Sequence, residues 1–140
     1  MKPNELRIGN FIATDNENTP LRVESIEDRE NNLYYVKAAT IEGFVGRKGS
    51  FPVPVLKGIV LTEEWLIKFG FQNLETKDGV GFYLPDFMFF ELWKKNADMG
   101  FFQFVRIVKG VVYLLSKKLK YVHELQNLYF SMTEHELKLN

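Results

Sequence analysis

The residues that could carry out chemistry are few, and their spacing matches no catalytic motif. The chain has no Cys, which excludes thiol catalysis, disulfides and cysteine zinc sites. His123 and Asn127 lie four residues apart, so one face of a helix could present both to a ligand. Zinc needs three or four protein ligands, and no second His lies at a useful spacing. Acid–base catalysis by His123 would need a carboxylate partner, and Glu124 points elsewhere on the helix. We therefore expect no enzyme, no cofactor and no metal site.

Basic residues gather in two places. Arg47 and Lys48 lie in a Gly-containing loop that lacks the spacing of a phosphate-binding loop and has no helix after it. Lys117, Lys118 and Lys120 lie beside two tyrosines and could contact nucleic-acid phosphates. The whole chain has 18 basic and 18 acidic residues, so it lacks the charge of a dedicated nucleic-acid binder. Nucleic-acid binding is therefore the alternative function.

A helix expected from about Leu119 to Met132 would present apolar residues on both of its sides. One side carries Tyr121, Val122, Leu125, Leu128, Tyr129 and Met132. The other carries His123, Gln126, Asn127 and Phe130. An apolar residue on this otherwise polar side is either buried in the same chain or offered to a partner. The second hypothesis makes these four residues a binding site for a partner protein or a second copy.

The best specified element is a helix at residues 61–70. Thr62 is a good N-cap, and the two glutamates after it place negative charge at the positive end of the helix dipole. Gly70 can adopt the left-handed conformation that ends a helix. Trp65, Leu66 and Phe69 share one stripe, which predicts that they are buried.

Short β-strands precede this helix. We expect strands at residues 6–13, 21–26, 33–38 and 40–45, with polar loops at 14–20 and 46–50. Residues 51–56 contain two prolines, which restrict them to an edge strand or an extended connector. Five short strands at this spacing favour a small antiparallel barrel of SH3-like type.

Strands also follow the helix. Residues 71–76 and 81–84 flank an Asp-Gly turn signal and predict a hairpin. The apolar run within residues 86–98 does not distinguish helix from strand, and we favour strand. Residues 101–108 and 111–115 predict a second hairpin across a Lys-Gly turn, with Val108 opposite Val111 and Arg106 opposite Tyr113.

Near the C-terminus, Thr133 and Glu136 have the spacing of a capping box, which predicts one more helical turn followed by a frayed end.

The predicted fold class is therefore α+β. Residues 1–60 form an SH3-like β-unit, and residues 61–140 add a helix, antiparallel strands and a closing helix, packed with the first unit as one globule. Hydrophobic residues make up 46% of the chain, which is enough for a sizeable core. No run approaches the length needed to span a bilayer, and no signal peptide is evident, so we expect a cytoplasmic protein.

Three sequence blocks carry a resemblance. They are LRIGN at residues 6–10, LTEEWL with KFGF at residues 61–71, and YVHELQNLYF at residues 121–130. The chain resembles a group of short uncharacterised proteins of Bacteroides-type bacteria, their phages and mobile elements. Similar proteins often end in a Leu-Thr-Gly-Glu-Glu-Leu-like tail, from which residues 132–137 depart. The resemblance implies a bacterial or phage setting and supplies no catalytic residues. We expect a non-enzymatic protein-interaction or regulatory module.

Overall fold

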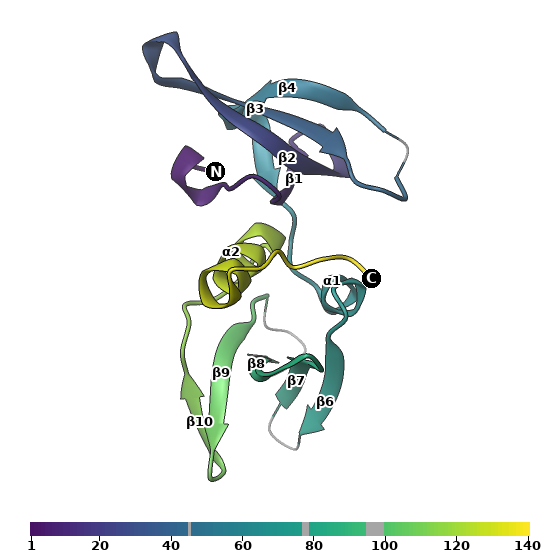
Figure 1. Cartoon of the computed structure of the whole chain (residues 1–140), viewed down its shortest axis with the longest axis vertical. Coiled ribbons are helices and arrows are strands. Elements are labelled where there is room, and N and C mark those ends of the chain that lie inside the picture. The colour runs from purple at the N-terminus through teal and green to yellow at the C-terminus, as the bar shows by residue number, and fades with distance from the viewer. Residues whose placement is uncertain (45, 77–78, 95–99) are drawn as a thin grey trace. The chain divides into compact units, whose positions relative to one another are not determined.

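The computed structural model describes residues 1–44, 46–76, 79–94 and 100–140, which fall into two compact units (Figure 1). Unit 1 comprises Met1–Val60 and Tyr121–Glu136, and unit 2 comprises Leu61–Lys120 and Leu137–Asn140. Within the described residues, each unit contains a five-stranded antiparallel sheet and one α-helix, so the chain is α+β. The sequence suggests a division at residue 60, but the C-terminal helix groups with unit 1 rather than with the second half.

The sheet of unit 1 has the strand order β4-β3-β2-β1-β5. Its strands are β1 (Phe11–Thr14), β2 (Glu17–Arg29), β3 (Leu33–Thr40), β4 (Lys48–Pro52) and β5 (Leu56–Gly58). A 3-10 turn at Val53–Val55 connects β4 to β5, and the helix α2 (Val122–Thr133) belongs to the same unit. The strand β4 lies at an edge of the sheet, as its proline predicts, because Pro has no N–H for a second ladder.

Three predicted segments of unit 1 are wrong. The strand expected from Leu6 begins only at Phe11, because Gly9 has a φ of 92° and the Arg7 N–H donates to the Asn10 side chain instead of to a ladder. The loop expected up to residue 20 is shorter, since β2 already begins at Glu17. The fourth strand was expected at residues 40–45, but β4 lies at 48–52, where it begins in the predicted loop and ends in the segment predicted as an edge strand; residue 45 is outside the described residues.

A continuous apolar core holds unit 1 together. Its buried members are Leu6, Ile12, Leu21, Val23, Val36, Ala38, Val53 and Leu56. Leu21 and Val23 share one side of β2, as their alternation predicts. The register with β3 then shifts between Val23 and Ser25, so the strict alternation of the strand is interrupted there by a bulge. Beyond this bulge, Ile26 packs against the core.

The short helix of unit 2, α1 (Glu63–Lys68), confirms its sequence signals. The Thr62 hydroxyl accepts a hydrogen bond from the Trp65 N–H at 3.4 Å, and Gly70 has a φ of 85°. Trp65, Leu66 and Phe69 are buried, as the stripe predicts. Neither α1 nor any other helix in the described part of the chain is long and apolar enough to cross a membrane.

The sheet of unit 2 has the order β10-β9-β8-β7-β6, so each strand pairs with its neighbour in sequence. The strands are β6 (Gln72–Thr76), β7 (Gly79–Leu84), β8 (Phe87–Lys94), β9 (Gln103–Val108) and β10 (Val111–Leu114). The first predicted hairpin is confirmed by β6 and β7, although residues 77 and 78 of its turn lie outside the described residues. The preferred strand at 86–98 is also confirmed, as β8, up to residue 94; residues 95–99 are not described.

Phenylalanine rings form much of the core of unit 2. Phe82 meets Phe102 edge to face at 5.9 Å between ring centroids, and Phe90 lies 4.8 Å from Phe104. Phe71 joins them through an edge contact with Phe90. Such pairs add to the free energy gained by burying their area, so the sheet is stabilised mainly on the side that carries these rings.

The C-terminal segment differs from its prediction. Thr133 is the last residue of α2, and its hydroxyl donates to the Tyr129 carbonyl at 2.8 Å instead of capping a new helix. The residue after Thr133 adopts the left-handed conformation that ends a helix. The tail is also anchored rather than frayed, since Leu137 is buried and the Asn140 N–H donates to the Lys68 carbonyl within unit 2.

Candidate protein-interaction surface

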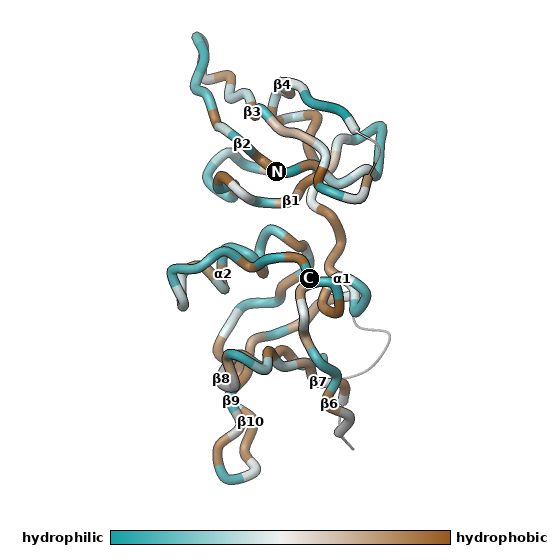
Figure 2. The backbone as a smooth tube through the Cα atoms, turned by 45° about the vertical axis from the view of Figure 1, so that its right-hand side comes forward, coloured by the Kyte–Doolittle hydropathy of each residue, from teal (hydrophilic) through white to brown (hydrophobic). Residues whose placement is uncertain are grey.

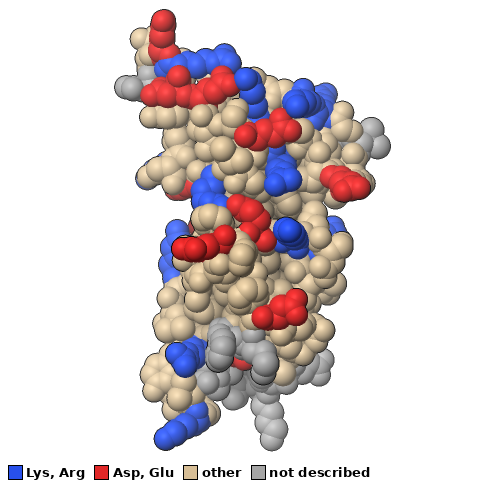
Figure 3. Space-filling view, viewed as in Figure 1, with Lys and Arg blue, Asp and Glu red and all other residues tan. Residues whose placement is uncertain are grey.

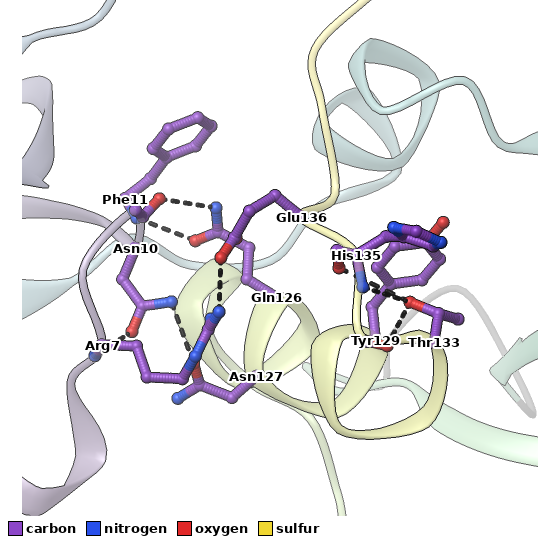
Figure 4. A network of polar contacts seen from close by, with 10 residues as sticks. Arg7, Asn10, Phe11, Gln126, Asn127, Tyr129, Thr133, His135 and Glu136 are labelled. Atoms are coloured by element: carbon purple, nitrogen blue, oxygen red, sulfur yellow. Dashed lines mark hydrogen bonds and ion pairs between the residues drawn. The ribbon is translucent and has the colours of Figure 1, made fainter.

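The side chain of Gln126 takes the place of a β-ladder partner in unit 1. Its Oε1 accepts from the Phe11 N–H at 2.8 Å, and its Nε2 donates to the Gly9 carbonyl at 3.2 Å (Figure 4). Phe11 is the first residue of β1, and Gln126 lies on α2. Gln126 is 1% exposed, and Gly9 and Phe11 are buried. The amide therefore satisfies two backbone groups that water cannot reach.

Asn127 and Phe130 continue this contact along α2. Asn127 accepts from the Asn10 amide at 2.9 Å and donates to the Glu5 carbonyl at 2.8 Å. The Arg7 guanidinium lies over the Phe130 ring, 3.8 Å from its centroid, in a cation–π arrangement. The same guanidinium is ion-paired with Glu136, which follows α2 (Figure 4). These contacts join the N-terminal residues of unit 1 to its helix.

His123, the fourth residue of the predicted partner-binding set, is also occupied within unit 1. It is 3% exposed, and its ring stacks on Tyr121 with centroids 5.7 Å apart and an interplanar angle of 10°. Contacts inside unit 1 are thus made by all four predicted side chains, those of His123, Gln126, Asn127 and Phe130. This agrees with the first alternative for the helix, in which this side packs within the same chain. Their role in binding a partner stays a prediction.

The residues of the nucleic-acid alternative fall into two groups. Arg47 is ion-paired with Glu17 at 2.9 Å, and Lys48 with Glu24 at 3.2 Å, so carboxylates of unit 1 offset both charges. Lys117, Lys118 and Lys120 are exposed and belong to unit 2. The Lys118 ammonium lies 4.6 Å from the centroid of the Phe101 ring. The first group is therefore held by ion pairs within unit 1, whereas the second group is exposed on unit 2.

The hairpin formed by β9 and β10 has the predicted register. Val108 pairs with Val111, and Arg106 pairs with Tyr113. Its turn residues, Lys109 and Gly110, have φ values of 50° and 78°. Two positive φ values are those of a type I′ turn, whose twist matches that of the flanking strands. The Lys-Gly dipeptide therefore determines both the turn and the pairing on either side of it.

This hairpin exposes an unusual amount of apolar surface. We call the following six side chains the hairpin surface: Val108, Val111, Val112, Tyr113, Leu114 and Leu115. They are between 40% and 56% exposed. Successive residues of a strand point to opposite faces, so the exposure of all four residues of β10 shows that neither of its faces is covered. Figure 2 shows mainly hydrophobic colours on the strands of the hairpin and a hydrophilic colour at its turn.

The charged residues of the segment that contains the hairpin surface all have the same sign. Residues 100–120 contain five basic residues and no Asp or Glu, in a chain whose total charge is zero. The basic ones are Arg106, Lys109, Lys117, Lys118 and Lys120, and all are exposed. Figure 3 shows blue and tan atoms, without red, over this hairpin. The hairpin segment therefore combines exposed apolar side chains with exposed basic ones.

The hairpin surface was not among the predicted sites, although the sequence contains two signals for it. Residues 111–115 are apolar without alternation, which is typical of a strand buried on both faces. That interpretation fails here, because β10 is the last strand of its sheet. The absence of acidic residues from 100 to 120 is the second signal, and it is visible only when charge is counted locally.

Comparisons with known proteins name no relative: no family model matches the sequence, and no curated protein or solved structure is significantly similar to it. Across the described residues, no three His, Asp or Glu side chains lie close enough together to hold a metal ion. The hairpin surface is accordingly the candidate site that the geometry of this chain defines best.

Proposed function

We propose that this protein is a non-enzymatic protein-interaction module that binds its partner through the hairpin surface. The observation that carries the proposal is the exposure of six apolar side chains on both faces of one edge hairpin. Soluble monomers rarely leave a contiguous apolar patch uncovered unless it is an interaction site. A role in a phage or mobile element, as in the group that the chain resembles, agrees with a small binding module.

Unit 1 would act as the scaffold of this module, and we assign it an SH3-like barrel topology. Two features support the assignment: the strand order β4-β3-β2-β1-β5, and the 3-10 turn at Val53–Val55 between the last two strands. The fold alone does not define a ligand, so the proposed binding site rests on unit 2.

The test compares two variants that each replace exposed apolar residues on strands with threonine, which preserves β-propensity. The double variant Tyr113→Thr, Leu114→Thr removes one apolar side chain from each face of β10, whereas Leu33→Thr changes an exposed leucine on β3. Proteins captured from host-cell extract by the wild type would be identified and purified, and their binding measured by calorimetry. We expect the double variant to lose this binding and Leu33→Thr to keep it. Equal binding by all three proteins would refute the proposal.

Nucleic acid is the second candidate, because residues 100–120 carry only positive charge. Its test is chromatography with light scattering in the presence of a short DNA duplex. Co-elution that is lost steeply as salt rises, and that persists in the Tyr113→Thr, Leu114→Thr variant, would favour the phosphate-binding role of Lys117, Lys118 and Lys120.

A further inference from the structure

The free edge of β10 offers unpaired backbone groups at two residues. In this hairpin, Val108 and Val111 form the pair next to the two-residue turn, and the Leu115 N–H donates to the Phe104 carbonyl at 2.8 Å. Hydrogen-bonded pairs alternate along an antiparallel ladder, so the N–H and C=O groups of Val112 and Leu114 point away from β9. No described strand lies on that side of β10. An uncovered edge of this kind is a template for another strand.

From this edge and its charge, we propose that the partner contributes an extended, acidic segment that adds to β10 as a sixth strand of the sheet. This inference rests on the proposed function and specifies the mode of binding. Main-chain hydrogen bonds to Val112 and Leu114 would hold the added strand, as in other cases of strand addition. Apolar side chains of the added strand would cover the hairpin surface on alternate faces.

The acidic character follows from the charges beside the edge. Lys109 lies at one end of β10, and Lys117 and Lys118 follow its other end. The two strands of the hairpin contain no Asp or Glu, and the nearest acidic residue in the sheet is Glu91 of β8, opposite Val105. Opposite charges on neighbouring strands stabilise a sheet, and like charges destabilise it. A segment with Asp or Glu among its apolar residues therefore complements both ends of the edge.

The same charges disfavour a second copy of this chain as the occupant. If two β10 strands paired antiparallel through their outward groups, Val112 of one copy would meet Leu114 of the other, with Tyr113 at the centre. Lys109 and Lys117 lie four residues on either side of Tyr113. Each lysine of one copy would then oppose a lysine of the other, at both ends of the ladder.

An anionic membrane is disfavoured by the backbone. Apolar side chains flanked by lysines would suit a lipid interface. However, hydrocarbon cannot hydrogen-bond to the outward groups of Val112 and Leu114, and leaving them unpaired in it is costly. A peptide strand satisfies those groups and the side chains together.

The experiment uses the full chain and the peptide Glu-Val-Glu-Val-Glu-Val-Glu-Val, with Lys-Val and N-methylated versions as controls. Binding is followed by NMR amide exchange. We expect the acidic peptide to slow exchange at Val112 and Leu114, the outward amides. The lysine version and the N-methylated version should each bind at least about tenfold more weakly, because one reverses the charge and the other removes the ladder donors.

A protein variant tests the same contact from the other side. Val112→Pro removes an N–H that faces solvent, a position at which edge strands tolerate proline. We expect it to weaken acidic-peptide binding at least about tenfold while circular dichroism stays unchanged. If this variant no longer forms the hairpin, strand addition is tested by the amide exchange rates and the control peptides on the wild-type protein alone.

Several results would overturn the inference. These are unchanged exchange at Val112 and Leu114, equal binding of the acidic and basic peptides, a dimer in light scattering, and binding only to phosphatidylglycerol vesicles or to a DNA duplex. If the Tyr113→Thr, Leu114→Thr variant no longer binds a purified partner and the Val112→Pro variant still binds it, strand addition is refuted and the proposed function stands. If no variant affects any partner, the proposed function fails as well.

Discussion

Replacing Gln126 with methionine tests whether a buried amide holds β1 in place. The change keeps the length and approximate volume of the side chain, so it opens little cavity. It leaves the Phe11 N–H and the Gly9 C=O without partners, and both residues are buried. Each orphaned group costs about 1–3 kcal/mol, or about 2–6 kcal/mol for the two.

Part of this cost is offset, because a thioether is easier to bury than an amide by about 1–2 kcal/mol. We therefore expect Gln126→Met to lower the free energy of unfolding by about 2–3 kcal/mol, the middle of the resulting range. The matched control is Met132→Gln, the reverse substitution at a residue of the same helix that is 50% exposed. It should change stability by less than about 0.5 kcal/mol.

Two measurements separate local from global effects. Urea unfolding followed by circular dichroism gives the change in stability, and amide hydrogen exchange of Phe11 reports on the lost bond. Both tryptophans, Trp65 and Trp93, belong to unit 2, so their fluorescence follows that unit separately. The reasoning is refuted if Gln126→Met unfolds at the wild-type urea concentration and the Phe11 amide keeps its protection.

Three further predictions concern local elements. Thr62→Ala should destabilise unit 2 by about 1 kcal/mol, because the first turn of α1 loses its cap; a Thr62→Ser variant should recover most of this in thermal melts. Hydrogen bonds from Lys37 and then Arg29 lower the pKa of Glu27 below its ordinary value. The Glu27 carboxylate therefore stabilises the fold at a pH above the pKa that Glu27 has in the unfolded chain. This stabilisation is lost as the pH falls through the pKa of Glu27 in the folded protein. An NMR titration should show the Glu27 midpoint rising in Lys37→Met, and an unmoved midpoint would contradict the assignment. Gly110→Val should lower the free energy of unfolding by about 1 kcal/mol or more, because valine disfavours the positive φ of this position. A Cβ here would meet no neighbouring atom, so the loss would come from the backbone alone. An unchanged melting temperature would argue against the turn geometry.

Elements specified by neighbours in sequence were predictable. The Lys-Gly turn requires two positive φ values, and from it the pairing of Val108 with Val111 and of Arg106 with Tyr113 follows by counting. The cap and burial of the helix at 63–68 depend on residues within one turn of each other. Such local signals carry their own geometry, so no tertiary information is needed.

Features that depend on distant partners were not predictable. Gln126 was expected on a helix side that is either buried in the chain or offered to a partner, and the sequence could not identify its actual partners, which lie at the other end of the chain. Thr133 has the spacing of a helix cap, but its hydroxyl bonds the preceding turn instead. The hairpin surface was missed for a related reason, because only the order of strands in the sheet reveals that β10 is an edge.

The bond between Phe11 and Gln126 also has a consequence for the order of events during protein synthesis. Its donor and acceptor are 115 residues apart. At a translation rate of about 5–20 residues per second, the first strand of unit 1 is made roughly 6–23 s before its partner helix. All of residues 61–120 are synthesised in that interval. A nascent chain must therefore keep the Phe11 N–H and the Gly9 C=O without their Gln126 partner while residues 61–120 emerge, and unit 1 is completed only after residues 121–136 have been made.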